Sequence, residues 1–225
     1  MKRFKYLGLM TCLYITFQLV SDVCAGKLID VLSYPVSVTV LFFPITYIFS
    51  DILTEVYGYT IARNVLWTVL ICSITAGLIY IGVAALSPSV IFQNNEAYKT
   101  VLGQVPRVLI GGWLAVFAGD ITNNFVLAKL KIITKGKHLW SRTISSTIAG
   151  QLVNTAVFYF IGLYNILPFN VLFTSIMSGW VIKVIVEVIF TPVTYWIVAK
   201  LKKEEQIDYY DYDTNFNPFK YRPPF

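Results

Sequence analysis

The feature that most constrains this chain is a series of apolar runs, each about as long as a bilayer crossing. About 20 apolar residues in a helix cover the hydrocarbon core of a membrane. Six runs approach that length, at about 6–25, 36–58, 64–86, 106–128, 143–164 and 171–199. Because the backbone has no water partner inside a bilayer, each run is expected to be helical. The sequence therefore predicts an all-α, polytopic membrane bundle of six transmembrane helices.

The composition agrees with a membrane location. Hydrophobic residues make up 56% of the chain and charged residues 13%, whereas soluble domains are about 25% charged. The net charge of +6 does not indicate nucleic-acid binding, because the cations cluster in short segments between the apolar runs. The three cysteines lie inside apolar runs without a CxxC pair, so we expect no disulfide framework, metal site or cofactor.

The basic residues set the expected orientation, because positive charge prefers the cytoplasmic side. One set of connections and the two ends hold most of them: Lys2, Arg3, Lys5, Arg63, Lys129, Lys131, Lys135, Lys137, Arg142, Lys200, Lys202 and Lys203. The opposite connections hold only Lys27, Lys99 and Arg107. Both termini are therefore expected in the cytoplasm. The basic start resembles a signal peptide, but the later runs favour an uncleaved first span.

The chain divides into two expected regions. Residues 1–203 are expected to form one six-helix transmembrane domain. Residues 204–225 alternate tyrosine with acidic side chains and finish in prolines, which predicts a disordered cytoplasmic tail. Within the first region, Pro168 is expected to break the chain between the fifth and sixth runs, and Pro192 to kink or tilt the last one.

Polar side chains recur inside four of the six apolar runs. An ionisable group near the bilayer centre costs at least about 2.5 kcal/mol, so it usually faces a cavity or a partner. These side chains fall on helical stripes beside aromatic residues. They are expected to line one cavity at or just below mid-membrane, where carrier sites lie. The candidate substrate-binding residues are Tyr47, Asp51, Glu55, Trp113, Asp120, Asn124, Gln151, Asn154 and Lys183.

Three structural interpretations compete with this one. Lys183 and Glu187, four residues apart, can pair with each other. Glu55 and Arg63 can sit in interfacial water. The amides of the fourth and fifth runs can serve as interhelical hydrogen-bonding groups, worth about 0.6–2 kcal/mol each. A purely structural bundle would rarely hold Asp51, Asp120 and Lys183 together.

The chemistry of these side chains indicates a class of ligand. Carboxylates accept hydrogen bonds from N–H groups, and amides both donate and accept. Aromatic rings offer flat faces for stacking. Together these groups suit a planar, nitrogen-rich heterocycle, such as a guanine-like edge that meets one carboxylate through two N–H donors.

Three stretches resemble the queuosine precursor transporter family, also called vitamin-uptake-type transporters. They are FPITYIFSDILTEVYGYTIAR at 43–63, GDITNNFVLAKLKIITKGKHLWSRTISSTIAGQLVNTAVFYFIG at 119–162 and IKVIVEVIFTPVTY at 182–195. The positions that match the family pattern are Asp51, Glu55, Tyr57, Gly58, Arg63, Lys131, Gly136, Trp140, Arg142, Ser146, Thr147, Lys183 and Pro192.

The resemblance implies a function. Members are six-helix bacterial inner-membrane proteins that import 7-deazaguanine precursors, such as 7-cyano- or 7-aminomethyl-7-deazaguanine, or queuine. Their bundle resembles the substrate-binding components of energy-coupling-factor transporters. Where this chain has Asp120 and Asn154, the family often has Glu or Gln and Asp, which leaves the identity of the precursor open. The expected partners are this small molecule and membrane lipid, with no nucleic acid.

Two alternatives stay open at the level of sequence. The chain can be the substrate-binding component of a multi-subunit transporter, or a homo-oligomer, with Ala76, Gly77, Gly111 and Gly112 making close helix contacts to a partner. The other alternative is a membrane enzyme. It is disfavoured, because the single histidine, His138, lies in a basic loop and the chain has no HExxH or nucleophile-elbow motif.

Overall fold

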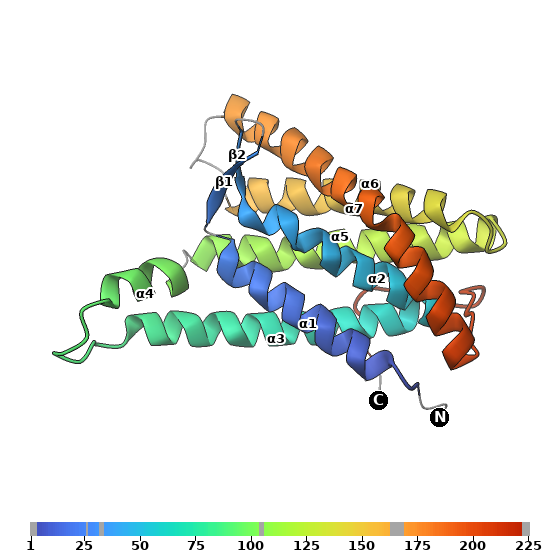
Figure 1. Ribbon diagram of the computed structural model, residues 1–225, viewed down its shortest axis with the longest axis horizontal. Coiled ribbons are helices and arrows are strands. Elements are labelled where there is room, and N and C mark those ends of the chain that lie inside the picture. The colour runs from blue at the N-terminus through green and yellow to red at the C-terminus, as the bar shows by residue number, and fades with distance from the viewer. Residues whose placement is uncertain (1–3, 26, 32–33, 104–105, 163–168, 222–225) are drawn as a thin grey trace.

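The protein is a helical bundle with a short two-stranded sheet at one end (Figure 1). The computed structural model describes residues 4–25, 27–31, 34–103, 106–162 and 169–221. The elements within these residues are α1 (Leu7–Cys24), β1 (Leu28–Val31), β2 (Tyr34–Ser37), the 3-10 helix η1 (Val38–Leu41), α2 (Phe43–Tyr57), α3 (Tyr59–Ala85), α4 (Asn95–Leu102), α5 (Pro106–Ile133), α6 (Leu139–Gly162) and α7 (Phe169–Glu205).

The second apolar run is not one helix, and this corrects its expected form, while the fold as a whole is a helical bundle as expected. Its first residues form β2, which pairs antiparallel with β1 so that Leu28 lies opposite Ser37. Val36 within β2 is β-branched, a residue type that favours extended structure, and the chain then turns into η1 at Val38–Leu41. The α-helix begins only at Phe43, with Pro44 in its first turn, where a missing N–H leaves no bond unmade.

Helix α2 is short and central. Its 15 residues span about 22 Å, less than the roughly 30 Å of a hydrocarbon core. Every residue of α2 except Ile45 is buried, and α1, α3, α5 and α7 pack around it. Protein therefore surrounds the helix on all sides, and Asp51 and Glu55 do not face lipid.

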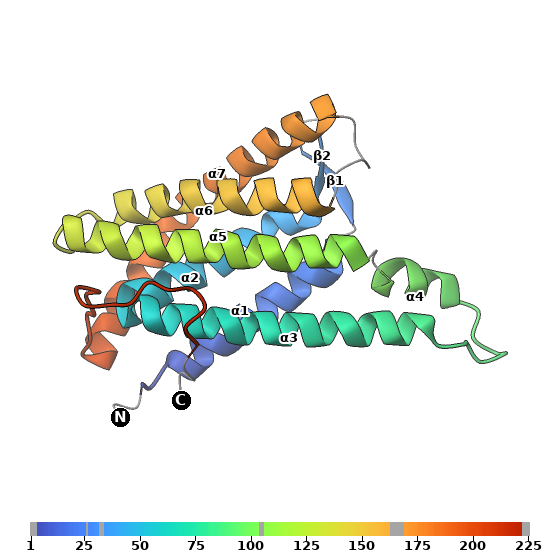
Figure 2. The same cartoon turned by 180° about the vertical axis from the view of Figure 1, so that it is seen from behind.

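Helices α5 and α6 lie side by side along most of their length (Figure 2). Glycines permit this approach. A Cβ on Gly111 would lie 2.8 Å from the backbone nitrogen of Gly162, and a Cβ on Gly150 would lie 2.9 Å from the carbonyl oxygen of Gly119. The close contact between these two helices is therefore set by their backbones, and it brings the polar residues of both to the centre of the bundle.

The outer surface of the bundle is apolar. Large side chains such as Ile71 and Leu78 on α3, and Ile189 and Trp196 on α7, are exposed. Within the described residues, four helices are long and apolar enough to cross a membrane: Leu7–Cys24, Tyr59–Ala85, Leu139–Gly162 and Phe173–Glu205. The protein is thus a multi-pass membrane bundle. The α2 helix is too short to meet that criterion alone, and α5 carries several polar residues.

The observed helices extend past several expected boundaries. Helix α5 continues to Ile133 and α7 to Glu205, and α7 runs through Pro192 without interruption. Helix α4 lies outside the six expected runs and has no buried residue. The break expected at Pro168 falls outside the described residues. The two termini lie at one end of the bundle, and β1, β2 and α4 lie toward the other (Figure 1).

The C-terminal segment, for which the sequence predicts disorder, follows a defined course through residue 221. It passes across the start of α3 beside α5 (Figure 2). The guanidinium of Arg63 donates to the carbonyl oxygens of Asn215 and Asn217 at 3.1 and 2.9 Å. The indole nitrogen of Trp67 donates to the carbonyl of Pro218 at 2.9 Å. Side chains of α3 thus donate hydrogen bonds to backbone carbonyls of the C-terminal segment that lack helix or sheet partners. The composition of the sequence does not reveal these contacts.

Asp208 fixes the beginning of this segment. Its carboxylate lies 2.6 Å from the ammonium of Lys131 and 2.8 Å from that of Lys202. Partial burial would raise the pKa of Asp208, but the hydrogen bonds and charges of the two lysines outweigh it and hold the pKa below its ordinary value. The ionised carboxylate of Asp208 is therefore the form that holds the C-terminal segment against α5 and α7.

We expect Asp208→Asn to loosen the tail at neutral pH. A lowered pKa means that the contribution is present above the ordinary pKa of aspartate and disappears as the pH falls through the folded value. Amide hydrogen exchange in residues 206–221, corrected for its intrinsic pH dependence, should be faster in Asp208→Asn, and faster in wild type only at acid pH. The exposed Asp213→Asn is the matched control. Equal amide exchange rates in Asp208→Asn and Asp213→Asn would contradict the role of Asp208 in holding the tail.

We also expect Gly111→Ala to destabilise the bundle, because its Cβ would meet the backbone of Gly162 at 2.8 Å. Overpacking of this kind typically costs about 1–3 kcal/mol. Thermal unfolding in detergent measures the effect. Gly82→Ala, whose Cβ would meet nothing within 4 Å, should not lower the midpoint, because alanine favours a helix over glycine. Equal midpoints for the two variants would mean that α5 and α6 are not in backbone contact there.

Candidate functional site

A cavity lies between the helices toward the end of the bundle that holds β1 and β2. Its volume is about 110 Å³, and part of it is open to the outside. This is below the range typical of small-molecule sites, about 300–1,000 Å³. Its walls come from α1, η1, α2, α5, α6 and α7, and they comprise Gln18, Ser21, Asp22, Ala25, Thr39, Phe43, Gly112, Ala115, Val116, Asn154, Phe158 and Lys183.

Three polar atoms in this lining have no hydrogen-bond partner. They are the Oε1 of Gln18, the Oγ of Ser21 and the Nδ2 of Asn154. The three residues are only 2%, 2% and 3% exposed. Buried polar groups are nearly always paired, and leaving one unpaired costs about 1–3 kcal/mol. The lining therefore offers one unpaired acceptor, one unpaired hydroxyl and one unpaired donor to a polar ligand.

The paired groups of the cavity hold these three in place. The Nε2 of Gln18 donates to Asp22 at 2.8 Å, which fixes that amide with its oxygen left over. The ammonium of Lys183 donates to the Oδ1 of Asn154 at 3.0 Å, which fixes the second amide with its nitrogen left over. The same ammonium lies 4.7 Å from the ring centre of Phe43, a cation–π contact.

Of the residues predicted from sequence, Asn154 and Lys183 line the cavity. Asp51, Asn124, Gln151 and Tyr47 line neither of the two hollows described here. All four are 0% exposed and belong to the packed interior. The predicted polar stripes thus converge in the interior. Most of their residues, however, pack against one another in a layer that does not line the cavity.

Hydrogen bonds between helices build that layer. The Nδ2 of Asn123 donates to Asp51 at 2.6 Å. The Oδ1 of Asn124 accepts from Ser50 at 2.8 Å and from Thr54 at 2.9 Å. This matches the interpretation of the amides as interhelical bonding groups. Gln151 differs, because neither its oxygen nor its nitrogen has a partner.

Asp120 and Tyr47 connect the layer to α1 and α6. The hydroxyl of Tyr14 donates to a carboxylate oxygen of Asp120. The hydroxyl of Tyr47 donates to the carbonyl oxygen of Gly150 at 3.4 Å. Asp120 is therefore held by α1, an element that contains none of the predicted site residues.

Glu55 does not belong with the other predicted site residues. Its carboxylate lies 2.9 Å from the guanidinium of Arg142, 2.6 Å from Lys202 and 3.6 Å from Lys131. Glu55 is therefore paired inside the protein and does not sit in interfacial water, and Arg63 is likewise buried, where it binds the tail. Glu55 is thus the centre of a buried ion cluster at the end of the bundle where the termini lie.

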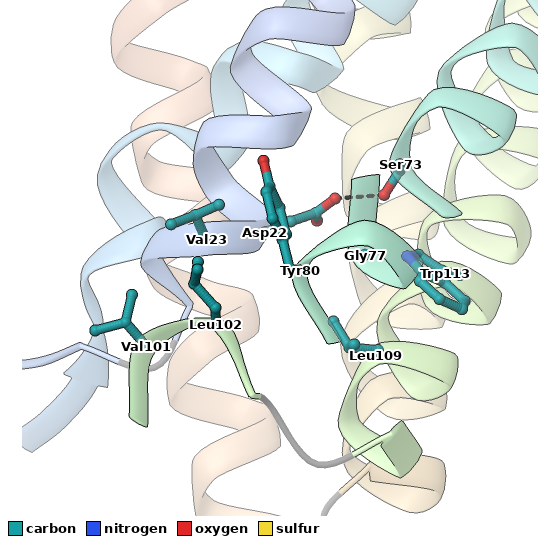
Figure 3. A pocket seen from close by; sticks show the side chains of 9 residues that line it. All are labelled: Asp22, Val23, Ser73, Gly77, Tyr80, Val101, Leu102, Leu109 and Trp113. Atoms are coloured by element: carbon teal, nitrogen blue, oxygen red, sulfur yellow. Dashed lines mark hydrogen bonds between the residues drawn. The ribbon is translucent and has the colours of Figure 1, made fainter. Parts of the chain in front are cut away.

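Trp113 lines a different, smaller hollow between α1, α3, α4 and α5 (Figure 3). Its ring packs on Gly77, where a Cβ would lie 2.7 Å from the indole. Asp22 forms part of the wall of both hollows, and Ser73 of α3 donates to its carboxylate. Gly77 and Gly111 are therefore used for packing inside this chain.

Sequence reasoning missed the three cavity residues of α1: Gln18, Ser21 and Asp22. A signal was present. The buried residues of α1 are Leu7, Thr11, Tyr14, Gln18 and Ser21, spaced alternately by four and three, as one face of a helix requires. A polar stripe in the first run therefore pointed into the bundle as clearly as those in the later runs.

The ion cluster gives a prediction about stability. We expect Glu55→Gln to destabilise the protein by about 3–5 kcal/mol, because removing one partner leaves buried cations uncompensated. Chemical unfolding in detergent measures the change. Glu96→Gln is the control, since Glu96 is exposed on α4 with a side chain 86% accessible. A Glu55 variant as stable as this control would show that the cluster contributes nothing.

Comparisons with known proteins identify the family of this chain. The family described as "Putative vitamin uptake transporter" matches residues 37–197. A protein of Bacillus subtilis (strain 168) named "Probable queuosine precursor transporter" is 27% identical over 158 residues, covering 70% of this chain and 69% of that protein. No solved structure matches the chain. The resemblance seen in the sequence motifs is confirmed: this chain belongs to the vitamin uptake transporter family and is a membrane transporter.

Proposed function

We propose that this protein imports queuosine precursors, 7-deazaguanine-type bases such as 7-cyano- or 7-aminomethyl-7-deazaguanine or queuine, across the bacterial inner membrane. The observation that carries the proposal is the unpaired polar trio of the cavity, Gln18, Ser21 and Asn154. The name of the Bacillus subtilis relative supports the substrate class. The cavity chemistry supports it independently.

The lining suits a flat base with N–H groups along one edge. The carboxylate of Asp22 is a hydrogen-bond acceptor in this lining, and Gln18 and Ser73 donate to it. The rings of Phe43 and Phe158 line the same space and offer stacking faces, which in nucleic-acid sites are worth about 1–3 kcal/mol per base. The free nitrogen of Asn154 can donate to a ring nitrogen or a carbonyl.

The proposed orientation puts the cavity mouth outside the cell. Both termini and the basic α5–α6 connection lie at the opposite end of the bundle (Figure 1), and basic segments favour the cytoplasm. We propose six crossings, formed by α1, α2, α3, α5, α6 and α7. In this arrangement the substrate meets Asn154 and Lys183 first. Asp51, Asn124, Gln151 and Tyr47 line the route that opens toward the cytoplasm.

The alternative of a binding component with separate energising subunits differs in one respect. A component of that kind needs a partner to release substrate inward. Two of the four small residues that suggested a partner surface, Gly77 and Gly111, are covered by Trp113 and Gly162. That packing favours a transporter that works without added subunits.

Uptake by purified protein tests the proposal. Proteoliposomes containing only this chain should exchange radiolabelled 7-cyano-7-deazaguanine, and Gln18→Leu should reduce exchange by at least tenfold, because the substitution removes both the free acceptor and the bond to Asp22. Gln93→Leu, the same change at an exposed position, should match wild type. Exchange that is absent for 7-cyano-, 7-aminomethyl-7-deazaguanine and queuine would refute the assigned substrate class. Equal exchange by Gln18→Leu would refute the site.

A further inference from the structure

Glu187 is a buried carboxylate that takes no part in the candidate site. It is 0% exposed, and neither of its oxygens has a hydrogen-bond partner. No ion pair found among the described residues includes it. An isolated carboxylate anion in such surroundings is strongly disfavoured against its neutral form. The pairing of Glu187 with Lys183 that the sequence allowed is not made in this state, because Lys183 donates to Asn154 and Thr155.

The groups around Glu187 supply no compensating charge. From α2, Asp51 and Tyr47 are close enough to interact with it electrostatically. Asp51 is itself an acid whose Oδ2 has no partner. On α7, Lys183 lies one turn away and is engaged with Asn154. On α6, Gln151 and Asn154 are uncharged.

The other ionisable groups at this level are already occupied. Asp120 of α5 accepts from Tyr14, and Glu55, one turn along α2 from Asp51, is paired with Arg142, Lys131 and Lys202. A metal ion is not indicated as the missing partner, since the described residues contain no group of three or more His, Cys, Asp or Glu placed to hold one.

We propose that Glu187, with Asp51 beside it, is a proton-binding site that couples substrate import to proton entry. In the present state Glu187 carries the proton, and Lys183 stays with Asn154 at the cavity. When the O–H bond of Glu187 breaks and the proton leaves for water at the cytoplasmic end, the carboxylate attracts the ammonium of Lys183 four residues away. The bond from Lys183 to Asn154 is then lost.

This exchange of partners links the two ligands. Asn154 and Lys183 line the cavity, so their rearrangement changes the surface that holds substrate. Substrate therefore binds more tightly when Glu187 is protonated, and by linkage the proton binds more tightly when substrate is present. The pairing of Lys183 with Glu187 belongs to the state after proton release. This inference rests on the proposed transport function for its coupling, but the proton site itself does not depend on the identity of the substrate.

The proton site is tested without any substrate. The infrared difference spectrum between purified wild type and Glu187→Gln at neutral pH should show a protonated carboxyl absorption in wild type. An ionised carboxylate absorption in its place would overturn the proposal. Because an amide resembles the neutral acid in shape and charge, Glu187→Gln should also fold as well as wild type. A variant that fails to fold would show that the anion is needed, and would overturn it too.

The coupling is tested in proteoliposomes with the membrane potential clamped. Radiolabelled 7-cyano-7-deazaguanine is the probe, because its nitrile binds no proton. Exchange at equal pH on both sides tests the proposed function alone. An outside more acid by one unit should then drive accumulation of up to about tenfold for one proton per substrate. In Glu187→Gln the gradient should produce no accumulation, whereas the exposed-site variant Glu96→Gln should respond as wild type.

Three outcomes would overturn the coupling. The first is wild-type exchange with no response to the gradient. The second is a Glu187→Gln response equal to that of wild type. The third is accumulation driven by a sodium gradient at equal pH. Absence of exchange would instead refute the proposed function, and the infrared measurement would still decide the proton site.

Discussion

Everything in this bundle follows from the cost of an unpaired charge or polar group where water is scarce. A membrane chain satisfies its backbone with helices, but each polar side chain needs a partner from another element. Glu55 finds three cations, and Lys131 and Lys202 extend that cluster to Asp208 in the tail. Toward the opposite end, the cavity lining holds three unpaired atoms: the Oε1 of Gln18, the Oγ of Ser21 and the Nδ2 of Asn154. Charge pairing is therefore concentrated at the end that holds Glu55, and the candidate cavity lies toward the other end.

The short central helix connects these two ends. Because α2 begins only at Phe43, β1, β2 and η1 occupy the space that another turn or two of helix would fill. Thr39 of η1 and Phe43 of α2 consequently stand at the cavity wall. Interrupted helices near a binding site are a recurring feature of transporters, because irregular backbone is tolerated in a membrane where it lines a cavity. The same helix carries Asp51 in the packed layer and Glu55 in the ion cluster.

The sequence predicted the helical membrane bundle, because long apolar runs have few alternative structures. It also placed Asp51, Asp120, Asn154 and Lys183 in the interior. It could not tell a packed layer from a hollow, since that depends on how α5 and α6 approach through Gly119 and Gly150. The buried face of α1 that holds Gln18 could also have been predicted from the spacing of its polar residues, but it was not.

The contacts of the C-terminal segment were less predictable than the α1 face. Its partners Arg63 and Trp67 are about 150 residues away in the chain, and its composition is that of a solvated end. Disorder was therefore the natural expectation from local sequence alone.

The central claim is that polar groups from separate helices converge on one cavity that recognises a flat nitrogen-rich base. An experimental structure with bound 7-cyano-7-deazaguanine tests this most directly. The account predicts the base between Phe43 and Phe158, with hydrogen bonds to the free oxygen of Gln18 and the free nitrogen of Asn154. A base bound elsewhere, with Gln18 and Asn154 still unpaired, would contradict it.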